Sequence, residues 1–150
     1  MRNKSVLNLD NFVPYRLSVL TNRVSSAIAR HYSDRFDLSI PEWRVMAVLG
    51  QTPGLSARQV AERTAMDKVQ VSRAVQSLLT ARRLTRVADD ADGRVTQLSL
   101  SARGLAIYNE LVPVALQLER DFLSILSADD RTALDKLLTK LSAGLAEVDL

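Results

Sequence analysis

Cysteine is absent from this chain of 150 residues, and histidine occurs once, at His31. Thiolate nucleophiles, disulfides and thiol-based redox sensors all require cysteine, and zinc sites are built mainly from cysteine and histidine. The five glycines form neither the Gly-x-Ser-x-Gly motif of serine hydrolases nor a glycine-rich phosphate-binding loop. We therefore expect no metal, no cofactor and no enzymatic activity. An enzyme that uses His31 remains an alternative, although the sequence shows no second acid–base residue at motif spacing.

A long apolar run is also missing. The longest stretch without a charged residue covers 13 residues, 45–57, and contains a Pro-Gly pair, whereas a membrane-spanning helix needs about 20 apolar residues. Near the N-terminus, Asp10 interrupts the segment after Arg2 and Lys4 before it reaches the apolar length of about 7–15 residues that a secretory signal requires. These absences predict a cytoplasmic protein without a transmembrane helix.

The charges are divided unevenly along the chain. Seven basic and four acidic residues lie in 1–54, nine and five in 55–104, and four and eight in 105–150. A local surplus of lysine and arginine is typical of surfaces that bind polyanions. We therefore expect the first two thirds of the chain to face a polyanion and the acidic last third to serve another purpose. With 47% hydrophobic residues, the chain has the composition of one folded domain, residues 1–150.

Six helices are predicted from apolar residues at helical periodicity and from capping residues. Four capping signals precede a side chain that can return a hydrogen bond to the cap, at Ser39, Ser56, Asp67 and Ser127. The predicted helices are 13–35, 40–51, 57–64, 68–83, 102–126 and 129–146. The predicted inward faces are Val13, Leu17, Leu20, Val24, Ala27, Ile28 and His31 in the first helix, Val71, Ala74, Val75, Leu78 and Arg82 in the fourth, and Leu105, Tyr108, Leu111, Ala115, Leu118, Phe122 and Ile125 in the fifth.

A two-stranded hairpin is predicted after the fourth helix, where the periodicity changes to two. Residues 84–87 and 95–100 are rich in strand formers, and they flank 89–93, where the Asp92-Gly93 step is typical of a tight turn. The order of elements predicts a mainly α fold with a small β-hairpin wing. In this fold a winged helix-turn-helix, residues 37–104, is flanked by long helices in 1–36 and 105–150.

Several short motifs resemble the MarR (multiple antibiotic resistance regulator) family, over about residues 12–145. They are Pro41-Glu-Trp-Arg44, Ser56-Ala-Arg-Gln-Val-Ala-Glu-Arg63, Asp67-Lys68 with Ser72-Arg73, Asp89-x-x-Asp92-x-Arg94, and Leu98-Ser-Leu-Ser-x-x-Gly104. The resemblance implies a homodimeric winged-helix regulator of transcription. It implies that the terminal helices dimerise, that helix 68–83 enters the major groove of double-stranded DNA, and that Arg94 in the wing reaches the minor groove.

The outer face of helix 68–83 carries residue types that match base edges. Glutamine can pair with adenine, arginine with guanine, and Val69 can contact a thymine methyl group. Family members often carry small hydroxyl residues where this chain has Val69 and Gln70, so the usual contacts cannot be copied there. Ser77 also lies on this outer face. The alternative is an ordinary solvated face. The candidate DNA-binding residues are Ser56, Lys68, Val69, Gln70, Ser72, Arg73, Gln76 and Arg94.

For Arg94, the alternative to a minor-groove contact is a surface ion pair with Asp92. A basic side chain at a hairpin tip is what a narrow minor groove attracts. Asp89 and Asp92 are expected to shape the turn rather than to contact DNA.

A ligand site is predicted from residues of the first, second and fifth helices. Arg16, Arg23 and Arg30 recur every seven residues beside the apolar face of the first helix, and cations beside aromatic rings suit an aromatic carboxylate or an acyl-CoA thioester. The candidate effector-binding residues are Arg16, Arg23, His31, Trp43, Arg44 and Tyr108. The alternatives are a row of solvated arginines, a core tryptophan and a packed histidine.

The long terminal helices carry apolar residues that a winged helix of about 65 residues cannot bury by itself. The candidate dimerisation residues are Leu17, Leu118, Phe122, Leu134, Leu137, Leu138, Leu141 and Leu145. The sequence thus predicts a dimeric DNA-binding repressor that binds a palindromic operator and is released by a small anionic aromatic effector. A helical dimerisation or adaptor module that does not use its winged helix on DNA is the alternative.

Overall fold

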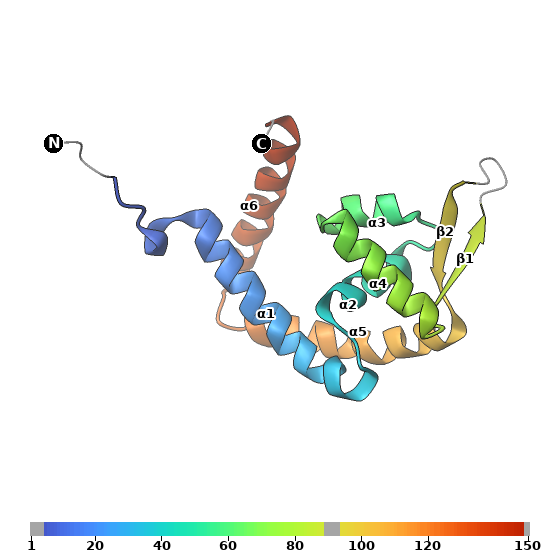
Figure 1. Cartoon of the computed structure of the whole chain (residues 1–150). Coiled ribbons are helices and arrows are strands. Elements are labelled where there is room, and N and C mark those ends of the chain that lie inside the picture. The colour runs from blue at the N-terminus through green and yellow to red at the C-terminus, as the bar shows by residue number, and fades with distance from the viewer. Residues whose placement is uncertain (1–4, 89–93, 149–150) are drawn as a thin grey trace. The chain divides into compact units, whose positions relative to one another are not determined.

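A computed structural model describes residues 5–88 and 94–148 and confirms the predicted fold class, mainly helical with one antiparallel hairpin. The elements are a 3-10 turn η1 (Leu9–Asn11), the helices α1 (Val13–Phe36), α2 (Ile40–Gln51), α3 (Ala57–Thr64) and α4 (Lys68–Thr80), the strands β1 (Leu84–Ala88) and β2 (Thr96–Leu100), and the helices α5 (Ala102–Leu123) and α6 (Ala128–Glu147) (Figure 1). In the described parts of the chain, every helix is too short or too polar to span a bilayer.

The predicted capping residues begin four of the helices. Ser39, Ser56 and Ser127 each accept a hydrogen bond from the backbone N–H three residues later, and the side chain at that position accepts one from the backbone N–H of the cap. Asp67 accepts from the backbone N–H groups of Val69 and Gln70. These bonds satisfy N–H groups that have no partner inside the helix, which explains why the predicted starts agree with the structure.

The end of α4 differs from the prediction. The helix ends at Thr80 rather than at residue 83, because Arg82 adopts a left-handed conformation with φ of 57°, which an α-helix cannot contain. Arg82 is therefore exposed and does not belong to the inward face. The other four predicted inward residues of this helix, Val71, Ala74, Val75 and Leu78, are buried.

The chain forms two compact units, 1–114 and 115–150. The core of the first lies among α2, α3, α4 and the hairpin and contains Val45, Met46, Leu49, Val60, Val71, Leu78 and Leu98. In the hairpin, Leu84 pairs with Leu100 and Ala88 with Thr96, and an isolated bridge joins Leu55 to Leu98. The hairpin is thereby attached to the segment that precedes α3. The predicted turn at Asp92-Gly93 lies outside the described residues.

The apolar faces of α1 and α5 agree with the prediction in part, since the predicted Ile28 of α1 packs against the core. In α1 the buried residue is Tyr32, which is 1% exposed, whereas Leu17 and Leu20 are 44% and 47% exposed. In α5 the predicted Leu111 is buried, together with Gly104 and Ile107, whereas the predicted Leu105 is exposed. Helical periodicity alone identified an apolar stripe, but residues distant in sequence determine which side of the helix is covered.

The second unit contains the end of α5 and all of α6. None of the described residues of α6 is buried in the single chain. Five leucines of α6 are between 36% and 58% exposed: Leu134, Leu137, Leu138, Leu141 and Leu145.

Candidate DNA-binding surface

The helix α4 presents one continuous polar face to solvent. Because Val71, Ala74, Val75 and Leu78 pack into the core, the opposite side of the helix is open. The candidates Lys68, Val69, Gln70, Ser72, Arg73 and Gln76 are all exposed. The structure therefore brings six of the eight candidate DNA-binding residues onto a single helix face.

Val69 is 57% exposed although it is apolar. It lies in the first turn of α4 next to Gln70, whose backbone N–H is held by the Asp67 side chain, 3.3 Å away. An exposed methyl pair beside amide groups can contact a thymine methyl group while the glutamine pairs with a base edge.

Ser56 is the N-cap residue of α3. Its Oγ accepts from the Gln59 backbone N–H at 3.2 Å, and Gln59 Oε1 accepts from the Ser56 N–H at 2.9 Å. A serine hydroxyl that accepts one bond still has a proton to donate. Capping α3 and donating to a phosphate oxygen are therefore compatible roles for this side chain.

Three exposed arginines of α3 and β1 were not among the sequence candidates. Arg58 on α3 pairs with Glu62 at 3.2 Å, Arg63 donates to Thr52 Oγ1 at 3.0 Å, and Arg86 lies on β1. A small hollow of about 180 Å³ separates α3 from the start of α4 and is lined by Ala57, Arg58, Ala61, Lys68 and Val71. The basic positions of α3 lie away from its buried residues, a signal that the sequence contained.

In the wing, Arg94 is exposed and precedes β2. The predicted turn-forming residues Asp89 and Asp92, and with them the alternative ion pair between Asp92 and Arg94, lie outside the described residues. The register of the two strands nevertheless places Arg94 beyond the paired residues, at the loop end of the hairpin.

Glu42 is the buried charged residue of the described core, at 9% exposure. It lies in the first turn of α2, where its Oε2 accepts from the Ser39 backbone N–H at 2.7 Å. Burial by itself would raise the pKa of Glu42, but hydrogen bonds from Ser39 and Ser77 and the positive charge of Arg83 outweigh it and lower the pKa. Ser77, which the sequence assigned to the outer face of α4, thus interacts with α2 through this carboxylate.

The aromatic candidates for effector binding form one cluster. The Trp43 ring centroid lies 5.8 Å from that of Tyr32 and 6.2 Å from that of Tyr108. Arg44 donates to Ser25 Oγ at 3.3 Å. Burial raises the pKa of the Tyr32 hydroxyl to about 12, although the charge of Arg44 acts in the opposite direction. The cluster therefore joins α1, α2 and α5 around a tryptophan.

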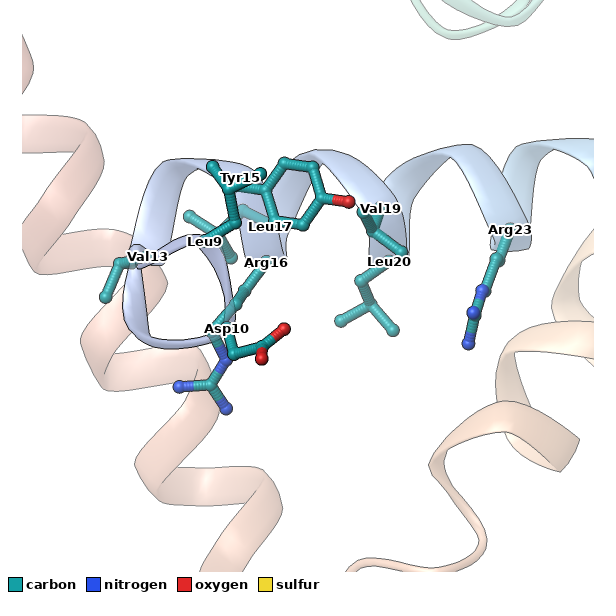
Figure 2. A pocket seen from close by; sticks show the side chains of 9 residues that line it. All are labelled: Leu9, Asp10, Val13, Tyr15, Arg16, Leu17, Val19, Leu20 and Arg23. Carbon is teal, nitrogen blue, oxygen red and sulfur yellow. The ribbon is translucent and has the colours of Figure 1, made fainter. Parts of the chain in front are cut away.

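The candidates Arg16 and Arg23 lie elsewhere. Arg16 and Arg23 line an open groove of about 680 Å³ beside η1 and the first half of α1, together with Leu9, Asp10, Val13, Tyr15, Leu17, Val19 and Leu20. Figure 2 shows Arg16, Leu20 and Arg23 extending to the same side of the helix. Tyr32, the residue of α1 in the cluster, follows Arg23 by nine residues, which is about 180° around a helix, so the groove and the aromatic cluster lie on opposite sides of α1. His31 is exposed.

The predicted effector-binding residues thus form two separate groups within one chain. The structure brings Trp43, Arg44 and Tyr108 together, and it separates them from Arg16 and Arg23. Within residues 5–88 and 94–148, no group of three or more histidine or acidic side chains could hold a metal ion.

Comparison with known proteins matches residues 36–95 to the MarR family. The HTH-type transcriptional repressor Rv2887 of Mycobacterium tuberculosis is 26% identical over 133 residues, which cover 88% of this chain and 92% of the relative. A MarR/EmrR family regulator from Acinetobacter sp. ADP1 has the same fold, with a TM-score of 0.85 at 22% identity, covering 95% of this chain and 100% of that one.

BpsR of Bordetella bronchiseptica, whose DNA binding is regulated by 6-hydroxynicotinic acid, has a TM-score of 0.79 at 25% identity and covers 92% of this chain and 98% of its own. The similarity in fold and sequence therefore extends well beyond the winged helix. Residues 36–95 thus match the model of the MarR family, and over most of its length the chain is similar to a transcriptional repressor and to solved regulators of that family.

Proposed function

We propose that this chain acts as a homodimeric, sequence-specific repressor that binds double-stranded DNA through α4 and the wing. The observation that carries the proposal is the exposed face of α4, where Gln70, Arg73 and Gln76 accompany Lys68. Side-chain amides and guanidinium groups on one helix face suit base edges in the major groove, and the lysine suits phosphate. The name of Rv2887, a transcriptional repressor, supports repression rather than activation.

The dimer is proposed from the exposed leucines of α6 and from the apolar residues near the N-terminus. Leu137, Leu141 and Leu145 are each more than half exposed, and so is Val13 at the start of α1. A second copy of the chain would cover these faces. Two recognition helices about 34–36 Å apart then meet successive major grooves, which predicts a palindromic operator.

Selection from a pool of randomised duplexes tests this proposal. The wild-type protein should enrich a palindromic sequence. Arg73→Ala and Gln76→Ala should then each relax discrimination at particular base pairs, by about 1–3 kcal/mol, because a base contact is lost. Exposed residues outside α4 provide the matched controls Arg103→Ala and Gln51→Ala.

A uniform loss of affinity across all single-base operator variants would show that Arg73 and Gln76 contact the backbone instead. Absence of any enriched sequence, with the dimer intact, would favour the adaptor function in which the winged helix does not bind DNA.

We further propose that a small aromatic acid, or its CoA thioester, lowers the affinity for the operator. Arg16 and Arg23 line the groove on α1 together with apolar side chains (Figure 2), which suits a carboxylate attached to a ring. The regulation of BpsR by 6-hydroxynicotinic acid, an aromatic carboxylate, supports this ligand class. The aromatic cluster around Trp43 lies on the other side of α1 and is the competing location.

Calorimetry with a panel of benzoates, cinnamates, 6-hydroxynicotinate and CoA thioesters tests the effector. A true effector should bind free protein about 5–150-fold more tightly than operator-bound protein, since coupling between two sites is reciprocal. Arg16→Gln should weaken binding if the groove holds the acid, whereas Trp43→Leu should do so if the aromatic cluster does. A ligand that binds both forms equally would not be an effector, and the DNA-binding proposal would stand without it.

A further inference from the structure

Arg83 follows α4, and its backbone forms hydrogen bonds both with that helix and with Ser101, the residue before α5. Its N–H donates to Leu78 O at 2.8 Å, and its carbonyl accepts from the Ser101 N–H at 3.0 Å. The carbonyl lies so close to α5 that a Cβ atom at Gly104 would be 2.0 Å from the Arg83 oxygen. Glycine at position 104 is therefore what allows this approach, and the Arg83 backbone is fixed on both sides.

The side chain of Arg83 reaches an element far away in the sequence. Its Nη2 donates to the carbonyl oxygen of Phe36, the last residue of α1. The carbonyl groups of the last helical turn have no partner inside the helix, and a cation is favourable there because of the helix dipole. Arg83 thus provides the end of α1 with both a hydrogen bond and a positive charge.

The same positive charge acts on the first turn of α2, because it favours the ionised form of Glu42. In addition, Nε of Arg83 is buried without a hydrogen-bond partner among the described residues. A buried donor without a partner costs free energy, so this burial would be unfavourable unless other contacts of the side chain offset it. Its location is explained by the contacts with the end of α1 and the start of α2.

The neighbouring Arg82 provides a contrast. It is exposed, and its carbonyl accepts from Ser101 Oγ at 2.7 Å. Replacement of Arg82 or Arg83 removes the same charge from adjacent positions of one turn. Only the change at Arg83 removes the bond to Phe36.

We propose that Arg83 is a positioning residue for DNA recognition, which holds the C-terminal end of α4 against the C-terminal end of α1. This inference rests on the proposed function, in which α4 reads the operator. Gln76 lies one turn before the end of α4, so a shift of this end moves the base-reading face. Because α1 also lines the groove proposed for the effector, the bond between Arg83 and Phe36 gives α1 a direct connection to the recognition helix.

Amide hydrogen exchange of the full-length protein without DNA tests the connection itself. In Arg83→Met, exchange should become faster both at residues 31–37 and at 76–83. In Arg82→Met it should remain at the wild-type rate at 31–37. Arg83→Lys, which keeps the charge and one donor group, should restore most of the protection. Wild-type protection at 31–37 in Arg83→Met would overturn the inference, independently of whether the protein binds DNA.

Binding of a selected duplex and of a random duplex of the same length tests the consequence for recognition. We expect Arg83→Met to lower the ratio of selected to random affinity at least 10-fold, and Arg82→Met to lower it less than 3-fold at matched salt. Arg83→Lys should lie close to wild type. Equal ratios for the two methionine variants would overturn the inference.

Two further measurements separate the possible failures. Thermal unfolding of each variant identifies a loss of folding, and Arg83→Gln replaces the methionine variant if that one does not fold. If the wild-type protein selects no sequence, the proposed function fails, and the exchange experiment alone decides whether Arg83 connects α4 to α1.

Discussion

At the scale of single residues, Glu42 illustrates how a buried carboxylate can be retained in a small core. It completes the capping box of α2 with Ser39, and it interacts with Ser77 of α4 and with the charge of Arg83. A buried charge is tolerated when it has hydrogen bonds and an opposite charge nearby. The net effect is a lowered pKa, so the folded protein favours the ionised form more strongly than the unfolded chain does.

The lowered pKa of Glu42 predicts a pH-dependent contribution to stability. The contribution is fully present above the ordinary pKa of 4.5 and is lost as the pH falls through the lower pKa of the folded state. Glu42→Gln keeps a side chain that can close the capping box but removes the charge. The free energies of unfolding of wild type and Glu42→Gln, measured by urea denaturation, should therefore differ at pH 7 and converge as the pH falls below 4.5.

Glu119→Gln, on the exposed part of α5, controls for the loss of one negative charge. Stability curves for wild type and Glu42→Gln that stay parallel down to pH 3 would contradict this account of Glu42.

At the scale of elements, the two structures proposed to bind DNA differ in how they are attached to the core. The helix α4 is fixed by four buried residues and by the cap at Asp67, whereas the hairpin has one buried residue in each strand, Leu84 and Leu98. A helix that is anchored in the core suits the reading of bases. A two-stranded extension suits a contact that follows the shape of the minor groove.

Replacement of Arg94 by alanine tests the contribution of the wing. We expect the affinity for a selected operator to fall by about 1–3 kcal/mol, because one basic contact to the groove is lost. Circular dichroism and sedimentation should remain unchanged, since Arg94 is exposed. Arg103→Ala removes an arginine outside the wing and serves as the control. Equal affinities of Arg94→Ala and wild type at matched salt would exclude the wing from DNA binding.

At the scale of the whole molecule, the single chain leaves the apolar side chains of α6 exposed. The described residues of α6 are all exposed, and Leu137 and Leu141 lie one helical turn apart on the same side. Exposed apolar surface of this extent is typical of protein interfaces. The acidic composition of 105–150 also makes this region unsuitable for contact with DNA.

The double variant Leu137→Asp with Leu141→Asp should therefore give monomers, because two charges would have to be buried in the interface. Its affinity for a palindromic operator should fall sharply, since only one half-site can be bound at a time. Sedimentation velocity measures the first effect, and titration of a labelled duplex the second.

Thr132→Asp with Thr139→Asp adds the same two charges elsewhere on α6 and should remain dimeric. Dimers of normal stability in the leucine variant would place the interface on other residues.

The element order and most helix boundaries could be predicted from the sequence because their causes are local. A capping bond joins residues three apart, as at Ser39 and Glu42. A strand is indicated by apolar and polar residues that alternate over about five positions. The outer face of α4 was predictable for the same reason, because its four buried positions recur at helical spacing. These features depend on neighbours in the chain and on little else.

Tertiary structure decided what depends on residues far apart in the sequence. Which side of α1 is covered is set by Trp43 packing on Tyr32, and this contact divides the predicted effector residues between two sides of the helix. The bond from Arg83 to Phe36 spans 47 residues and has no periodic signature. The chain itself determines helices and faces through short-range hydrogen bonds and side-chain spacing, but the choice among possible partners for each face requires the folded core.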